Sequence, residues 1–244
     1  MSSISETVSS SQYSLKNSWF SICSKSVELD LPTPKWKKYA WSCNEASAKR
    51  LYRGIAIQKP KFIVETGTFE GLGTFIMAKA AHENNNGAHI FTIDYDGDPN
   101  VQLPREDWLQ LKGIRENNLD LIRREFSGVE ITFIEGDSRK VLPQLFFNSL
   151  EHWDFFYQDS MHDMEGILAE WEVMRKFAKP GSTVVFDDIE LTSKVIIKQI
   201  LGGNGNGNDF SAYFFWNEVI RGSWTYQSIA DEHPQFWAQK TKSD

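Results

Sequence analysis

Cysteine is scarce in this sequence of 244 residues, which contains only Cys23 and Cys43. Two cysteines without a CxxC spacing argue against a zinc site and against a disulfide framework, and reduced thiols in a cytoplasmic protein are the default expectation. No apolar run is long enough to cross a bilayer, and the Ser-rich residues 1–14 lack the apolar stretch of a signal peptide. We therefore expect a disordered segment over 1–14 and a cytoplasmic protein without a membrane span.

Basic residues are also in the minority. The 26 Lys and Arg residues are outnumbered by 33 Asp and Glu residues, so the formal net charge is −7. The densest basic groups, Lys35 to Lys38 and the pair Arg123–Arg124, are typical of solvated surfaces. Binding to a nucleic-acid duplex needs a concentrated basic face, so nucleic acid is not an expected partner.

The length suits one α/β domain, and from Lys61 onward short apolar runs alternate with segments of helical spacing. We expect strands at 62–65, 89–94, 129–134, 153–157 and 183–186, and helices at 73–81, 106–126 and 165–177. This alternation predicts right-handed βαβ units and a parallel sheet covered on both faces. An amphipathic helix is expected at 44–57, within a helical segment over 15–60 that precedes the main domain at 61–244.

The pattern changes after the fifth strand. We expect a short helix at 191–201, a flexible Gly- and Asn-rich loop at 202–209, and strands at 212–216 and 224–228 that pair in antiparallel fashion. The sheet would then have seven strands, mostly parallel, with an antiparallel C-terminal strand. The aromatic residues of this region are candidates for the core, for the wall of an acceptor pocket or for a homodimer face, and we expect alternate members of each strand to lie in the core.

An acid stands at the end of each of the five expected strands. In order these acids are Glu65, Asp94, Asp137, Asp159 and the pair Asp187–Asp188. Open parallel sheets bind ligands outside the carboxyl ends of their strands, so these side chains should form one negative rim. Such a rim suits cationic ligands, hydroxyl-rich ligands and metal ions.

The first of these acids opens a glycine turn, Glu65 to Gly73. Gly67 and Gly71 would let the backbone turn tightly and approach a ligand. The spacing E-x-G-x-x-x-G differs from the dinucleotide fingerprint G-x-G-x-x-G, and the acids Glu65 and Glu70 would repel a pyrophosphate. Both features argue against an NAD-binding protein. Asp94, at the end of the next strand, could accept hydrogen bonds from both hydroxyls of a ribose.

Three stretches, 65–71, 93–94 and 135–138, resemble in order the cofactor motifs of class I S-adenosylmethionine (SAM)-dependent methyltransferases. The block from Trp153 to Ile189 is similar to that of a broad group that includes catechol-type and macrolide-sugar O-methyltransferases. The resemblance covers roughly residues 60–190, and it implies a Rossmann-like three-layer sandwich. At Asp159–Ser160 the sequence departs from the Asp-Gly that is usual at this place.

The resemblance also implies roles for individual residues in binding SAM. The methionyl part would lie against the glycine turn, the ribose against the second strand end, and the adenine edge against the third. The implied cofactor-binding residues are Glu65, Gly67, Thr68, Gly71, Asp94, Asp137, Ser138 and Asp159.

A divalent metal such as Mg²⁺ is the second cofactor to consider. Asp159, Asp187 and Asp188 end adjacent strands, and three carboxylates that converge cannot all stay ionised without a cation. In catechol-type relatives a metal at this place is held by two acids and an amide, and Asp188 stands here in place of the amide. The alternative is that Asp188 caps the following helix while Asp187 binds substrate or water.

His162 stands three residues after Asp159, where catechol-type relatives use a lysine as the base. A histidine suits proton removal near neutral pH, so His162 and Asp159 are the candidate catalytic residues. The alternative is a surface histidine without a catalytic contact.

Together these features predict a SAM-dependent methyltransferase that methylates an oxygen of a small hydroxylated molecule, with or without a metal. N-methylation, or another reaction on the same scaffold, is the alternative within the family. An NAD-binding protein and a non-catalytic binding module are the alternatives outside it.

Overall fold

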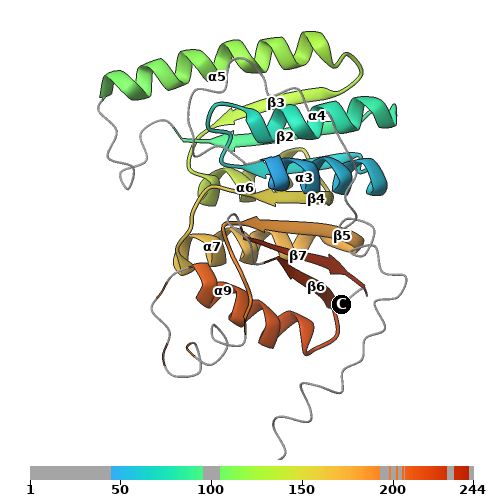
Figure 1. Cartoon of the computed structure of the whole chain (residues 1–244), viewed down its shortest axis with the longest axis vertical. Helices are drawn as coiled ribbons and strands as arrows, with labels where there is room; N and C mark the ends of the chain where they lie inside the picture. Colours follow the sequence, from blue (N-terminus) through green and yellow to red (C-terminus); the bar gives the residue numbers. More distant parts are fainter. Residues whose placement is uncertain are drawn as a thin grey trace, which may run out of the picture. The chain divides into compact units, whose positions relative to one another are not determined.

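The computed structural model describes residues 45–95, 105–192, 207–229 and 234–241, together with residues 198, 202 and 205. Seven strands form one sheet, shown in Figure 1. The strands are β1 (Phe62–Thr66), β2 (His89–Asp94), β3 (Glu130–Glu135), β4 (Trp153–Gln158), β5 (Ala178–Asp187), β6 (Trp224–Ile229) and β7 (Gln235–Lys240).

The strand order is β3-β2-β1-β4-β5-β7-β6. Strands β1 to β5 pair in parallel, so that Val64 of β1 lies opposite Phe91 of β2 and Phe156 of β4. Strand β7 runs antiparallel to both of its neighbours, β5 and β6. The prediction of a mostly parallel, seven-stranded sheet with an antiparallel C-terminal strand is confirmed.

Helices cover the two faces of this sheet (Figure 1). On one face lie α3 (Glu45–Gln58), α4 (Leu72–Asn84) and α5 (Arg105–Glu125). On the other lie α6 (Ser138–Asn148), α7 (Met164–Met174) with a 3-10 turn at Arg175–Phe177, and α9 (Gly207–Phe214), which is followed by a π-helical turn at Phe215–Val219. Within these residues no helix has both the length and the apolar character that crossing a membrane requires.

Aromatic side chains fill the core beneath the second helical layer. The ring of Trp171 on α7 lies 4.9 Å from that of Phe214 on α9 and 5.1 Å from that of Trp224 on β6. Phe236 of β7 completes the cluster, and all four side chains are buried. These members of the C-terminal aromatic run therefore belong to the core, whereas Trp216 is 42% exposed.

Short polar caps explain where α6 and α7 begin. The carboxylate of Asp137 accepts a hydrogen bond from the Arg139 N–H at the start of α6, at 3.1 Å. The carboxylate of Asp163 accepts from the Gly166 N–H at the start of α7, at 2.7 Å. Each bond satisfies an amide that has no partner within its own helix.

The expected strand at 212–216 is wrong. Residues 207–214 form α9, because Phe210 and Phe214, four positions apart, bury their rings together on the aromatic cluster. The loop expected at 202–209 accordingly ends earlier, at the start of α9. The antiparallel partner of β6 is β7, for which no strand was expected. Most of the helix expected at 191–201, and the whole of residues 1–14, lie outside the described residues.

Candidate active site

The glycine turn after β1 packs tightly against the end of β4. Gly67 has φ +91°, and its N–H donates to the Ile93 carbonyl at 2.9 Å. A β-carbon at position 67 would collide with the Asp159 carbonyl oxygen and would lie 2.9 Å from the Ser160 nitrogen. Gly71 also has φ +91°, but a β-carbon there would make only ordinary contacts. Gly67 is therefore required both by conformation and by space, and Gly71 by conformation alone.

Glu65, at the end of β1, is fully buried. Its Oε2 accepts hydrogen bonds from Thr74 Oγ1 at 2.5 Å and Thr92 Oγ1 at 2.6 Å. The Thr92 hydroxyl in turn lies 2.6 Å from that of Thr68, which is also buried. Among the described residues, no group hydrogen-bonds to Glu65 Oε1.

The carboxyl group of Glu65 consequently has a raised pKa. Burial raises this pKa to about 7, the hydrogen bonds from the Thr74 and Thr92 hydroxyls lower it, and the negative charge of Asp94 raises it. Glycine at position 73 makes room for Oε1 itself, since a β-carbon there would overlap this oxygen. A buried carboxylate oxygen without a hydrogen-bond partner among the described residues is a suitable acceptor for a cationic N–H donor.

Asp94, at the end of β2, already serves three donors of the protein. Its Oδ2 accepts from the Phe69 N–H at 2.6 Å and from Arg115 Nη1 at 3.1 Å. Its Oδ1 accepts from the Tyr95 N–H at 2.7 Å. The Asp94 carboxylate is therefore held in place by groups from the residue after β2, the glycine turn and α5.

The side chains of Asp137 and Ser138 both form hydrogen bonds with other side chains of the protein. The Asp137 carboxylate pairs with the Arg139 guanidinium at 2.9 Å, and this hydrogen bond lowers the pKa of Asp137. The Ser138 hydroxyl is buried and donates to the carboxylate of Glu170 on α7. The Ser138 hydroxyl is thus occupied within the protein.

Acids from β1, β4 and β5 act on one another electrostatically. Burial raises the pKa of Asp159 well above its ordinary value, and the charges of Asp187, Asp188 and Glu65 add to this effect. Burial also raises the pKa of Asp187, to about 7, although Gln235 Nε2 donates to its Oδ1 at 2.6 Å. The Tyr157 hydroxyl donates to Asp159 Oδ2 at 3.2 Å.

The structure does not assemble these acids as a metal centre. In the described parts of the chain, no group of three or more His, Cys, Asp or Glu side chains is arranged to hold a metal ion. Asp159 accepts a hydrogen bond from Tyr157, and Asp187 accepts one from Gln235. Asp188 is exposed and has φ +56°. The expected metal ligands Asp159, Asp187 and Asp188 therefore lie near one another without forming such a group.

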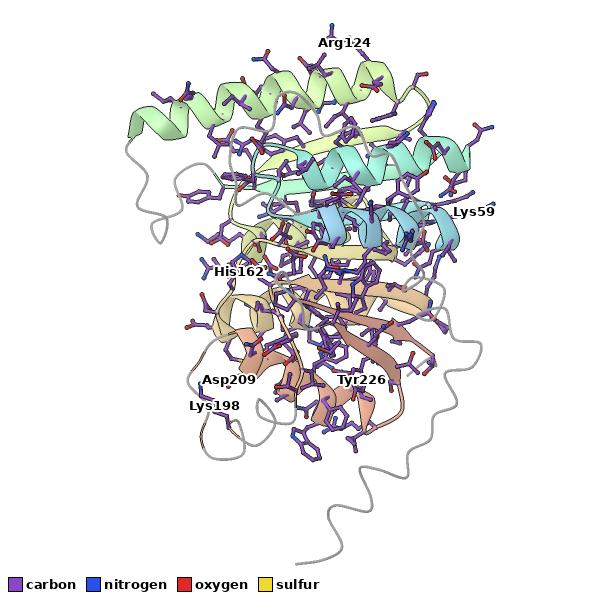
Figure 2. The ribbon with its side chains drawn as sticks, viewed as in Figure 1. Lys59, Arg124, His162, Lys198, Asp209 and Tyr226 are labelled. Carbon is purple, nitrogen blue, oxygen red and sulfur yellow. The ribbon has the colours of Figure 1, made fainter. Side chains whose placement is uncertain are left out.

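His162 is exposed on the loop that joins β4 to α7. Figure 2 labels it on the side of the molecule where the parallel strands end. This is the side that also carries Glu65, Asp94 and Asp159, so the structure brings the candidate base to the same edge of the sheet as the cofactor candidates.

Two buried charged residues of this site were not expected from the sequence. Arg115 of α5 is 1% exposed and lies with its guanidinium 4.7 Å from the centre of the Phe133 ring. Glu170 of α7 is fully buried. Both lie at helical spacing among apolar residues, and Arg115 is four positions from Leu111 and from Leu119. This spacing is the feature of the sequence that indicates their burial.

A family model described as a methyltransferase domain matches residues 64–189, just over half of the chain. The solved structures with a similar fold include an O-methyltransferase from Bacillus cereus in complex with SAH (16% identity, TM-score 0.61, covering 83% of this chain and 84% of that one). They also include the O-methyltransferase TomG from Streptomyces achromogenes, involved in tomaymycin synthesis and in complex with SAM (17% identity, TM-score 0.57, 82% of each chain). No curated protein matches the sequence. The chain therefore belongs to the methyltransferase domain family, and its fold is that of class I SAM-dependent methyltransferases.

Proposed function

We propose that this methyltransferase transfers the methyl group of SAM to a hydroxyl oxygen of a small molecule. The observation that carries the proposal is the buried Oε1 of Glu65, which has no hydrogen-bond partner among the described residues and lies against Gly73, where a β-carbon would overlap it. SAM presents an ammonium group, a ribose and a sulfonium, and the ammonium is the kind of donor that this oxygen suits.

The fit of the site to SAM extends along the strand ends. Glu65 would accept a hydrogen bond from the ammonium, and Asp94 would accept one from a ribose hydroxyl. Burial and the charge of Asp187 raise the pKa of Asp159, and burial and the charge of Asp188 raise the pKa of Asp187, so this environment favours a cation over an anion. A pyrophosphate would be repelled here, which disfavours an NAD-dependent reaction.

SAM, when bound, supplies an electrophilic methyl carbon on a positively charged sulfur. The protein then has to orient the acceptor and remove its proton. We assign the proton removal to the imidazole of His162, with Asp159 orienting the acceptor hydroxyl beside it. The acceptor oxygen forms its bond to the methyl carbon as the carbon–sulfur bond breaks and its electrons return to sulfur. The B. cereus protein and TomG are O-methyltransferases, and this supports oxygen as the acceptor atom.

Among the described residues, Asp159, Asp187 and Asp188 do not form a group that could hold a divalent metal ion. We therefore propose the reaction without a metal. A dependence of the methylation rate on Mg²⁺, measured with the acceptors of the second test below, would reinstate the metal-assisted form of the reaction.

The first test is isothermal titration calorimetry with SAM, SAH and NAD, each with and without Mg²⁺. We expect SAM and SAH to bind and NAD not to bind. In Glu65→Gln the affinity for SAM should fall about 10- to 100-fold, because a hydrogen bond to a charged group contributes about 1.5–3 kcal/mol. Asp154→Asn is the matched control, since Asp154 is a carboxylate near the opposite end of β4, where it binds Lys179 at 2.6 Å. Binding of NAD in place of SAM would refute the proposal.

The second test concerns the acceptor and the base. Purified protein with SAM is offered phenols, catechols, sugars and amines, and methylated products are identified by mass spectrometry. With a hydroxylated acceptor, His162→Ala should lower kcat by about 10²- to 10⁴-fold and leave SAH affinity unchanged. Methylation of amines alone would replace O-methylation with N-methylation, and an unchanged kcat would remove His162 from the mechanism.

A further inference from the structure

A buried carboxylate that the proposed reaction does not use is bonded to three residues beside the proposed site. Glu170 is fully buried on α7, between turns that carry the apolar residues Ile167 and Met174. Its Oε1 accepts hydrogen bonds from the hydroxyls of Ser138 and Ser160, the latter at 2.7 Å. Its Oε2 accepts from the Thr66 hydroxyl at 3.1 Å.

Folding alone does not account for a carboxylate at this position. Burial raises the pKa of Glu170 and disfavours its charge, and the three hydroxyls together with the Gln158 side chain oppose this effect. Replacing a buried charge and its partners by apolar groups of similar volume is often neutral or stabilising. The apolar stripe of α7 would readily continue through this position, so a reason other than stability is needed.

The three hydroxyl groups come from three separate strand ends. Thr66 is the last residue of β1 and precedes the tightly packed Gly67. Ser138 begins α6 after β3, and Ser160 follows Asp159 after β4. Each of the three is adjacent in sequence to a residue of the proposed SAM site, namely Gly67, Asp137 and Asp159. One carboxylate therefore joins three loops that converge on that site.

Ser160 adds a second observation. The resemblance to O-methyltransferases predicts an Asp-Gly pair after the fourth strand, whereas this chain has Asp159–Ser160. The hydroxyl that a glycine would lack is the one that bonds to Glu170. The departure in sequence and the buried acid are thus parts of one arrangement.

We propose that Glu170 is a positioning residue that holds the loops after β1, β3 and β4 in the geometry that binds SAM. This inference rests on the proposed function. Glu170 acts through Thr66, Ser138 and Ser160, whose hydroxyls face it, so that the neighbouring residues Gly67, Asp137 and Asp159 keep their places at the cofactor. Affinity for the cofactor should then depend on Glu170.

The test compares SAH affinity with stability in matched variants of the full chain. Glu170→Leu removes the acceptor oxygens at similar volume, and Glu170→Gln keeps one carbonyl oxygen for the serines. We expect the SAH Kd to rise about tenfold or more in Glu170→Leu, and to return to within about threefold of the wild-type value in Glu170→Gln. The control is Glu172→Gln on the same helix, where the carboxylate instead pairs with Arg175 at 2.9 Å.

The outcomes separate the two proposals. If wild-type protein binds SAH and Glu170→Leu binds it equally well, Glu170 is only structural and the inference is overturned while the function stands. If wild-type protein fails to bind SAH, the proposed function fails first and the inference fails with it. Should Glu170→Leu not fold, the double variant Thr66→Val/Ser160→Ala keeps the carboxylate and removes two of its donors. A rise of its SAH Kd by about threefold or more supports the inference, and an unchanged Kd overturns it.

Discussion

Replacing Gly67 by alanine tests the contact between the glycine turn and the end of β4. At φ +91° an L-residue pays about 1–2 kcal/mol for the left-handed backbone. The added β-carbon would also lie 2.5 Å from the Asp159 carbonyl carbon and 2.9 Å from the Ser160 nitrogen. These are backbone atoms, which cannot move aside by changing a rotamer, so one of the strand ends must shift, at about 1–3 kcal/mol more. The total, about 2–5 kcal/mol, is a large part of the stability of an ordinary domain.

A second glycine isolates the steric part of this cost. Gly181 has the same φ of +91°, and nothing lies within 4 Å of the place where its β-carbon would be. Urea unfolding followed by circular dichroism should show that Gly67→Ala loses at least about 1 kcal/mol more than Gly181→Ala. SAH affinity should fall in Gly67→Ala alone. Equal losses in the two variants would mean that the turn does not pack against β4 as described, and the reasoning would fail.

Two further predictions concern charge. Because burial raises the pKa of Glu65 from 4.5 to about 7, the folded state holds this proton more tightly than the unfolded state. The unfolding free energy of the unliganded protein should therefore fall as pH rises from about 4.5 to about 7, by up to about 3 kcal/mol. In urea titrations at several pH values, Glu65→Gln should show a weaker dependence of this free energy on pH. The same dependence in the wild type and in Glu65→Gln would contradict a raised pKa of the Glu65 carboxyl group. Asp94→Asn should lower the unfolding free energy by about 1–3 kcal/mol, because it weakens an ion pair with the buried Arg115. Asp137→Asn should lower it by under about 1 kcal/mol, because the partner Arg139 is 43% exposed. Thermal unfolding measures both, and similar losses would argue against a special role for the buried pair.

The strands that position the site could be predicted because their sequence signal is local. Runs such as Phe62–Glu65 and His89–Asp94 are short, apolar and β-branched, and each leads directly into a turn. Parallel pairing then requires that their ends meet at one edge, so the sequence alone predicts that Glu65, Asp94 and Asp159 lie together. The structure agrees with that placement.

The C-terminal region was harder because its aromatic residues suit more than one structure. Phe214, Phe215 and Trp216 have high strand propensity, but burial against Trp171 selects a helix, and that contact joins residues far apart in sequence. Helix α6 was missed as well, since it contains Pro143.

Hydrogen-bond partners within the site were beyond prediction for a related reason. The sequence did not reveal that Arg115 and the Phe69 N–H, which belong to other elements, donate hydrogen bonds to Asp94. Gln235 likewise reaches Asp187 from β7, a strand that had not been expected. Pattern and spacing locate side chains along one element, and they do not reveal which side chain of another element will arrive beside them.

The position of β7 has a consequence for biosynthesis. This strand follows β6 in the chain but lies between β5 and β6 in the sheet. As the protein emerges from the ribosome, β6 has no strand to pair with, and the edge of β5 remains open, until residues 235–240 are released. A nascent chain that stalls before this point would expose an unpaired hydrogen-bonding edge and would lack the glutamine that binds Asp187. Both the closing of the sheet and the completion of its acidic rim therefore wait for the same late segment.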